Sequence, residues 1–525
     1  MNFNQIKFGK PVTYLDGVVN YLKGAMIWGF RSKYKWSQTT PDIWGFANPT
    51  DIDPEATAIY NRIIADGGVS NLTRLNYFVV GLKTIYATLD NVPVCYDAHW
   101  IGYKLGSGTG ATAGQAAAKL YSLTVAGDAV QATAASQPLL LAHNGASSDN
   151  YWWGSGVSGN YVRTPNGTAN SNNGDKEIIA KIDITNLTNQ VELVNKDDVG
   201  SNRSWRIFIT STRFITVFAA TDLSTYTTNA PTSDVALPVN FIGFLKTTFS
   251  FTGGNLNVIF SISSDGITYT QLGTQRSKSG NNLINTGSEL AIGIVPNIGV
   301  SDKIKIYRVT LANSIGGAPV VDFNPATYNA STSQTQWTSA TGEVWTINTG
   351  TATTGYKGTI VDRVIVMSDG VDDNMISTVN RANLLTQYLA VKPYINDNTV
   401  DRTVIDANGT SFQNSISLTS SLFYYVLNGF GGSKAISNTI NTLQILAAIS
   451  NAGVKNSLSK NNSGEVSDTY TPTPSSNGIF VFGKGNGAAN GKSNVILNTY
   501  IYINLADNLT IQTSTYNLLK TLNNL

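Results

Sequence analysis

The chain has 525 residues, a formal net charge of +2, a single cysteine (Cys95) and only 13% charged residues. The length suffices for three or four domains with cores of their own. The lone cysteine excludes an internal disulfide. The charge is balanced and no Lys/Arg cluster is present, which argues against nucleic-acid binding. The sequence contains no run of eighteen apolar residues, so insertion into a membrane is not predicted.

Charged residues are about half as frequent as the typical ~25%, and Gly, Asn, Ser and Thr take their place. These residues favour turns and half-buried strands, so the composition predicts many short strands. The first 50 residues carry Trp28, Trp36 and Trp44 between polar turns. Two interpretations fit them equally well: an irregular arm or small sheet without a function of its own, or a segment that anchors the chain to neighbouring proteins. We take 1–50 as an N-terminal anchoring arm.

Residues 53–90 have the three- and four-residue apolar spacing of two amphipathic helices that pack on each other. Asp53 is the expected N-cap of the first helix, Gly67 ends it, and Ser70 is the expected cap of the second. The Gly- and Ala-rich stretch 101–140 is expected to be a flexible linker or a loosely structured lead-in to a sheet.

Apolar and polar residues alternate from about residue 145 onward, as in 178–184, which is the period of a half-buried strand. Asp265-Gly266 between two such runs predicts a hairpin. Short strands with turn signals and few helices indicate an antiparallel sandwich. A second β block spans 358–525 and ends in a short helix that we expect to dock on the sandwich.

Two stretches resemble concanavalin-A-like (laminin-G-like) jelly-roll domains, which are common in structural and tail-fibre proteins of tailed phages. Residues 303–349 are similar to the closing part of such a domain, and 366–376 to the first strand of another. The resemblance covers roughly 53–525, more by pattern than by identity. It implies a mainly β chain with two tandem antiparallel jelly-roll sandwiches, preceded by a small helical hairpin and an N-terminal arm. The expected divisions are 1–50 for the arm, 51–140 for the hairpin and lead-in, 141–352 for the first sandwich and 358–525 for the second sandwich with its C-terminal helix.

Aromatic side chains stack on sugar rings where they are exposed, although in a sandwich they usually belong to the core. Among the aromatic residues, Trp152 and Trp153 are the pair that we select as candidate ligand contacts. Asp369, Asp372 and Asp373 present carboxylates of the kind that Ca²⁺ takes as ligands. Their irregular spacing favours a turn beside a strand, so Ca²⁺ is possible and no other cofactor is expected.

Few features of the sequence indicate catalytic activity. His99 and His143 lie far apart, and neither is near a nucleophile motif. The Gly-rich stretch 483–493 ends like a phosphate-binding loop, yet position 486 is Asn486 and the following residues are those of a strand. We therefore expect no enzyme. The alternative is a glycan-degrading enzyme, such as a capsule depolymerase or a glycoside hydrolase with lectin-like modules.

The resemblance implies an exposed virion protein, on the tail, a fibre or the head surface. We expect it to assemble with other virion proteins as a homo-oligomer and to contact host surface glycans. Residues 1–10 lack the apolar stretch of a secretory leader, which fits a protein made in a cytoplasm and released by lysis.

Overall fold

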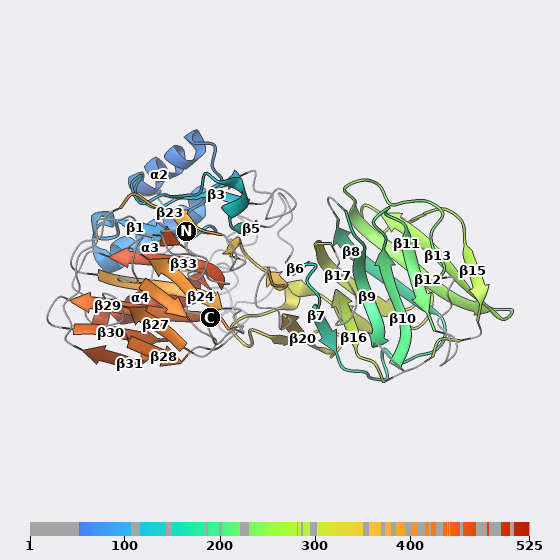
Figure 1. The fold of residues 1–525 in the computed structure, drawn as a ribbon. Coiled ribbons are helices and arrows are strands. Elements are labelled where there is room, and N and C mark those ends of the chain that lie inside the picture. The colour runs from blue at the N-terminus through green and yellow to red at the C-terminus, as the bar shows by residue number, and fades with distance from the viewer. Residues whose placement is uncertain are drawn as a thin grey trace, which may run out of the picture.

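The computed structural model folds into two β lobes joined by a narrow connection, and every strand pairing among the described residues is antiparallel (Figure 1). The mainly β class with two antiparallel sandwiches and a small helical hairpin is confirmed. Residues 1–50 of the expected arm lie outside the described residues. The structure describes residues 52–106, 116–142, 150–184, 187–198, 202–220, 230–280, 282–284, 287–293, 302–349, 356–368, 373–379, 385–393, 402–406, 415–418, 422–426, 434–437, 439, 442–451, 455–468, 480–481, 495–503 and 509–523.

The first sandwich occupies the lobe shown in green and yellow in Figure 1. A single apolar core lies between its two sheets and includes Trp205, Phe249 and Trp345. One sheet has the order β11 (Ile215–Ala219), β10 (Asn202–Ile209), β9 (Val191–Asp198), β16 (Leu290–Gly293), β7 (Asn160–Thr164), β20 (Val344–Thr349) and β19 (Gln336–Thr338). The other has the order β14 (Thr270–Gln271), β13 (Asn255–Ser263), β12 (Ile242–Thr252), β8 (Lys176–Asp183), β17 (Ile304–Ala312), β6 (Tyr151–Gly154) and β21 (Thr359–Val361), with β15 (Arg276–Ser279) beside β13 and β18 (Val321–Phe323) beside β17.

The period-two alternation of the sequence sets the register of these strands. In β8 the side chains of Ile178, Ala180 and Ile182 enter the core, while Lys181 points to the other face of the sheet. The predicted hairpin at Asp265 joins β13 to β14. Hydrogen bonds from the N–H groups of Thr268 and Ile267 and from the Ser263 hydroxyl to its carboxylate fix this turn and lower the pKa of Asp265 to about 2.

The second sandwich combines strands from both sides of the first in the sequence. β1 (Val94–Tyr96) pairs with β33 (Val495–Ile503), β5 (Leu139–Leu141) with β22 (Ile365–Met367), and β4 (Ala129–Val130) with β23 (Met375–Ile376). The first sandwich is therefore inserted between two parts of the second. The expected boundary between 51–140 and 358–525 does not separate two bodies, because backbone N–H and C=O groups of the two segments satisfy each other.

The Gly- and Ala-rich stretch 101–140 forms paired strands where it is described, which corrects the expected linker or loose lead-in. β2 (Tyr103–Gly106) pairs with β3 (Ala116–Leu120), and β3 pairs with β4. Small side chains suit this stretch, since Ala116 and Ala117 are fully buried between larger neighbours. The remaining strands of this lobe are β24 (Leu385–Pro393), β25 (Arg402–Asp406), β26 (Ser415–Leu418), β27 (Leu422–Val426), β28 (Lys434–Ser437), β29 (Gln444–Asn451), β30 (Lys455–Lys460), β31 (Ser463–Asp468) and β32 (Phe480–Val481).

Strand β33 is apolar on both faces, and every one of its residues is buried. Leu497, Tyr500 and Tyr502 face the core between the two sheets, whereas Ile501 and Ile503 face a second core under the helices. Three helices cover that outer face: α2 (Pro54–Ala65), α3 (Leu72–Tyr86) and α4 (Leu509–Leu522). The expected docking of the C-terminal helix is thereby confirmed. None of the helices in the described part of the chain has the length and apolarity that crossing a membrane requires.

The predicted helical hairpin forms with one change at a cap. Asp53 caps α2 by accepting a hydrogen bond from Glu55 N, and Gly67 follows that helix with a φ of 75°. The predicted cap of α3 was wrong, because Asn71 and not Ser70 accepts the hydrogen bond from Arg74 N. The Ser70 hydroxyl instead donates to Ile101 O, which ties the link between the helices to the sheet.

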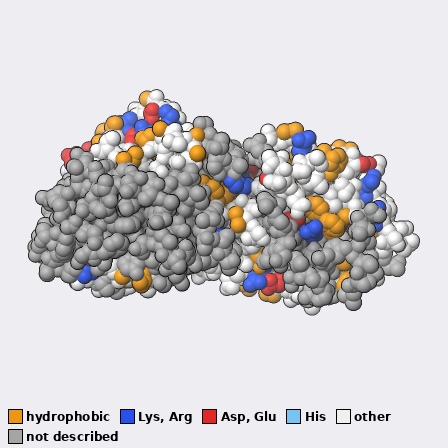
Figure 2. All heavy atoms as spheres, viewed as in Figure 1, with side chains coloured by type: hydrophobic (Ala, Val, Ile, Leu, Met, Phe, Trp, Pro, Cys, Tyr) orange, Lys and Arg blue, Asp and Glu red, His pale blue; other side chains and the backbone are white. Residues whose placement is uncertain are grey.

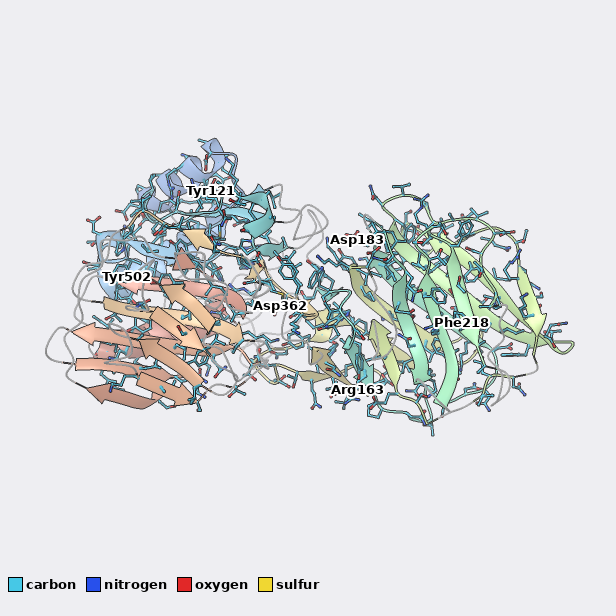
Figure 3. All side chains as sticks on the ribbon, in the orientation of Figure 1. Tyr121, Arg163, Asp183, Phe218, Asp362 and Tyr502 are labelled. Atoms are coloured by element: carbon cyan, nitrogen blue, oxygen red, sulfur yellow. The ribbon has the colours of Figure 1, made fainter. Side chains whose placement is uncertain are left out.

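A buried polar network holds the chain where it returns from the first sandwich. Asp362 lies in the connection between the lobes (Figure 3). The next residue, Arg363, is 4% exposed and donates to both carboxylate oxygens of Asp97 at 3.1 and 3.2 Å. Arg363 also donates to Leu522 O at the end of α4, and Thr499 on β33 donates to Asp97 at 2.7 Å. The ion pair between Arg363 and Asp97 therefore joins four parts of the chain: the loop of Asp97, strand β33, the end of α4 and the connection between the lobes.

Candidate ligand pocket of the first sandwich

Trp152 and Trp153, the predicted ligand contacts, are consecutive on β6 and so point to opposite faces of the sheet. Trp152 is 0% exposed in the core of the first sandwich. Trp153 is 4% exposed and packs edge-on against Tyr356 in the apolar cluster between the lobes. Both indoles take part in packing, and neither presents a ring to solvent. Their ligand contact stays a prediction.

Of the three predicted metal ligands, Asp369 and Asp372 lie outside the described residues. Asp373 is 1% exposed and accepts a hydrogen bond from the Tyr356 hydroxyl at 3.1 Å. Within the described ranges, no three His, Cys, Asp or Glu side chains come together as a metal ion would require. The Ca²⁺ site stays a prediction.

His99 has a structural place in the second sandwich. Its Nδ1 accepts a hydrogen bond from Val364 N at 3.2 Å, and its ring contacts Trp100 edge-on. His99 therefore holds the connection beside Arg363. His143 and the Gly-rich stretch 483–493 lie outside the described residues.

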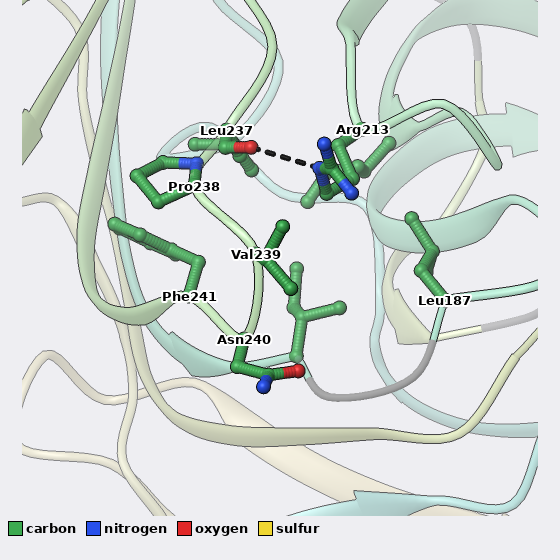
Figure 4. Close-up of a pocket in the computed structure, with 9 residues that line it drawn as sticks. Leu187, Arg213, Leu237, Pro238, Val239, Asn240 and Phe241 are labelled. Carbon is green, nitrogen blue, oxygen red and sulfur yellow. Dashed lines mark hydrogen bonds between the residues drawn. The ribbon is translucent and has the colours of Figure 1, made fainter.

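A pocket of about 160 Å³ opens at one end of the first sandwich, where β8 ends and β12 begins. Ile184 N donates to Phe241 O at 2.9 Å and so closes the ladder between these strands beside the pocket. In Figure 4, Pro238 and Phe241 line one side, and Arg213 and Leu187 line the opposite side. The lining residues are Ile184, Leu187, Ile209, Arg213, Leu237, Pro238, Val239, Asn240 and Phe241. Most of the wall is apolar, and among the described lining residues Arg213 alone is charged.

Arg213 is placed by the hairpin between β10 and β11. Arg213 N donates to Thr210 O at 2.8 Å, and Thr210 N donates to Phe214 O at 2.8 Å. This turn gives Arg213 a φ of 69°, the left-handed region that glycine adopts without cost and that costs other residues on the order of 1 kcal/mol. Strain of this kind in a non-glycine residue at a pocket is a pointer to function.

The guanidinium of Arg213 is held in place but not neutralised. Its Nε donates to Leu237 O at 3.0 Å, and Leu237 N donates back to Arg213 O at 2.9 Å (Figure 4). Among the described residues, neither Nη atom has a hydrogen-bond or ion-pair partner, and no Asp, Glu or His lines the pocket. The arrangement offers a fork of N–H donors beside an apolar wall, which suits a ligand with a carboxylate on an otherwise apolar face.

The outer face of β8 and β12, next to the pocket, alternates lysines with aromatic rings. The Nζ atom of Lys181 lies 5.7 Å from the Phe244 ring centre and 5.3 Å from that of Tyr307, and Lys246 Nζ lies 4.3 Å from the Tyr269 ring centre. Figure 2 shows lysine and arginine side chains beside hydrophobic ones on the described surface of this lobe. The strands that form the pocket thus also carry lysines and aromatic rings, and the carboxylates of Glu177 and Asp265 are close enough to Tyr269 to raise its pKa.

Sequence reasoning missed Arg213. The stretch Thr210-Ser-Thr-Arg213-Phe214 lies between two apolar runs, at the spacing of a short hairpin turn. The one available signal was an arginine at a turn position where glycine or asparagine is favoured. Sequence does not reveal which turn residue takes a positive φ, or that loop 237–241 lies opposite.

No protein-family model matches the chain, and no curated protein sequence matches it. Among solved structures, the chain is similar to domains LG4-5 of the mouse laminin α1 chain, with a TM-score of 0.24 and 10% identity over 70% of this chain and 92% of that one. It is also similar to a Trypanosoma rangeli sialidase in complex with sialic acid (TM-score 0.27, 11% identity, 64% of this chain and 54% of that one). A third similar structure is a pentraxin from Limulus polyphemus, with a TM-score of 0.22 and 8% identity over 32% of this chain and 77% of that one. At these TM-scores the likenesses carry no conclusion about fold or activity.

Proposed function

We propose that this protein binds glycans without cleaving them and that its pocket takes the carboxylated sugar of an acidic polysaccharide. The observation that carries the proposal is the pair of Nη atoms of Arg213, which have no partner among the described residues and lie beside an apolar wall. A planar guanidinium matches a carboxylate with two parallel hydrogen bonds, and the apolar wall suits the C–H face of a sugar ring. A volume of about 160 Å³ limits the occupant to a small group such as one sugar residue.

The neighbouring lysine and aromatic surface supports a polymer rather than a free sugar. A polysaccharide whose acidic residue enters the pocket has its next residues beside Phe244 and Tyr269. There, ring faces stack on sugars, and Lys181 and Lys246 attract carboxylates. Hydrolysis of a glycosidic bond uses a pair of carboxyl groups, one as the general acid. Because none of the lining residues that the structure describes is acidic, we take the pocket to bind and not to cleave.

Replacing Arg213 by glycine is expected to lower affinity much more than stability. Affinity for a uronic- or sialic-acid-containing polysaccharide should fall about tenfold to a hundredfold, since charged hydrogen bonds are worth roughly 1.5–3 kcal/mol. The free energy of unfolding should change by no more than about 1 kcal/mol, because relief of the left-handed strain opposes the loss of the Nε hydrogen bond to Leu237 O. Titration calorimetry and urea unfolding measure the two quantities.

The matched control is Arg163→Gln, which removes an exposed arginine that is paired with Glu289 at 2.7 Å and should leave affinity unchanged. Arg213→Lys keeps the positive charge but loses the two parallel N–H donors, so its affinity should lie between that of the natural protein and that of Arg213→Gly. Unchanged binding by Arg213→Gly would refute the pocket. New reducing ends during incubation of the natural protein with the polysaccharide would refute the non-enzymatic role and favour the depolymerase alternative.

We also propose that the protein acts on a phage particle, where it assembles with other virion proteins as a homo-oligomer. Support comes from the low-charge, strand-rich composition and the resemblance of residues 303–349 to phage jelly-roll domains. Many copies on one particle would multiply a weak single-site affinity without any new contact. An antibody against the chain should label intact particles, and unlabelled particles would refute this location.

A further inference from the structure

Two lysines project into the interior of the first sandwich from opposite sheets. Lys176 is on β8, on the same side as the core residue Ile178, and Lys196 is on β9, on the same side as the core residue Val194. Each lysine is only 1% exposed. Lys196 Nζ contacts Asn166 and Asn170 in the segment that leads into Lys176, and the charge of Lys176 lowers the pKa of Lys196. Two cationic side chains therefore meet at one end of an otherwise apolar core.

None of the groups that bind these ammonium ions carries a negative charge. Lys196 Nζ donates to Asn166 Oδ1 at 2.6 Å, to Asn170 Oδ1 at 3.3 Å and to Ser288 O at 2.9 Å. Lys176 Nζ is buried with no hydrogen-bond partner among the described residues. A buried ammonium without a partner is strongly unfavourable, and the repulsion between two of them adds to that cost.

Among the carboxylates near these lysines whose side chains the structure describes, Asp175 and Glu289 have other partners. Asp175 accepts a hydrogen bond from Phe251 N at 3.0 Å, and Glu289 pairs with Arg163 at the surface. Asn170 also cannot supply charge, and its amide is used to fix the loop that covers this end, through Gly167 N and Pro165 O. The protein encloses a double positive charge and leaves one ammonium with unused donors.

We propose that a small monovalent anion of the halide class binds between Lys176 and Lys196. Such an ion accepts hydrogen bonds from any direction, so it satisfies the unused donors of Lys176 and screens the two ammonium ions from each other. A monovalent ion leaves the site with one net positive charge, which the neutral oxygens around Lys196 already accommodate.

Thermal unfolding of the full chain at about pH 7 tests the site, with sodium chloride compared with sodium gluconate at equal ionic strength. We expect the unfolding temperature to be higher in chloride by roughly 2–4 °C, with a saturable dependence on chloride concentration. Lys176→Met keeps the length of the side chain and removes the charge, so it should lose the chloride-specific shift. Lys278→Met, on the edge strand β15, should keep it.

Equal unfolding temperatures of the natural protein in the two salts would overturn the proposal, as would an undiminished chloride shift in Lys176→Met. A second measurement does not depend on the folding of a variant. Crystals of the natural protein soaked in bromide should give an anomalous peak between the two Nζ atoms, and bromide found only elsewhere on the molecule would also overturn the site.

Discussion

Replacing Arg363 by alanine is expected to lower the free energy of unfolding of the second sandwich by about 3–5 kcal/mol, the range for removing one partner of a buried ion pair. The side chain binds Asp97 through both carboxylate oxygens and also holds the end of α4 through Leu522 O. Burial raises the pKa of Asp97, and Arg363 opposes that rise. Without the Arg363 guanidinium, the Asp97 carboxylate would keep its hydrogen bonds but lose its ion-pair partner, and Arg74 would be the remaining cation that acts on it.

The pH dependence of this loss identifies its cause. In Arg363→Ala the pKa of Asp97 should rise further above its unfolded value, so the folded variant gains from protonation of Asp97 at low pH. Its free energy of unfolding should then fall as the pH increases above about 4, the pKa of an aspartate in the unfolded chain, and more steeply than that of the natural protein. Urea unfolding at several pH values measures this.

The double variant Arg363→Ala, Asp97→Asn is the control, because it removes the unpaired charge and should recover part of the loss. If the single variant lost less than about 1 kcal/mol, or if its stability did not depend on pH, the ion pair would not be what fixes the connection between the lobes.

Local patterns in the sequence predicted local structure well. The N-cap at Asp53, the helix end at Gly67 and the hairpin at Asp265 each depend on residues within a few positions, whose preferences are strong. The change from Ser70 to Asn71 shows the limit of this reasoning. Both residues are good caps, and the contact of Ser70 with Ile101, thirty-one positions away, decides between them.

The pairing of strands from distant segments could not be predicted from the sequence. Alternation identifies β5 and β22 as strands, but nothing local says that Leu141 lies opposite Ile365. The insertion of one sandwich into the other was therefore missed. The largely apolar β33, which is polar only at Asn498 and Thr499, was the available signal, since a strand buried on both faces needs a cover such as the helices of 54–86.

The candidate residues differ in the face of the sheet toward which their side chains point, and this determines what they contact. Trp152 and Trp153 look equivalent in the sequence, yet one enters the core of a sandwich and the other the cluster between the lobes. Arg213 carried no motif at all, and a positive φ together with a facing loop makes it the pocket residue. Positions of this kind are fixed by tertiary structure and not by local pattern.

The free energy of unfolding is expected to rise as the pH increases from about 7.5 to about 9.5 in a chloride-free buffer. Burial lowers the pKa of four lysines from 10.5 to about 8, with the charge of Lys176 adding to the effect at Lys196; the four are Lys176, Lys196, Lys357 and Lys392. Between these two pKa values the unfolded chain binds protons that the folded chain does not, so a lower pH favours unfolding. Each lysine should contribute on the order of 2 kcal/mol over this interval.

Burial also raises the pKa values of Cys95 and Tyr96, and these groups act in the opposite direction. The unfolded chain loses their protons first, which favours unfolding above about pH 9. The difference between the natural protein and Lys196→Met isolates the lysine effect, since the cysteine and tyrosine contributions are common to both. The stability of Lys196→Met should rise less with pH by on the order of 2 kcal/mol, while the edge-strand control Lys278→Met should follow the natural protein. Parallel pH curves for the natural protein and Lys196→Met would mean that the Lys196 ammonium stays charged in the core at no cost, and the need for an anion beside it would disappear as well.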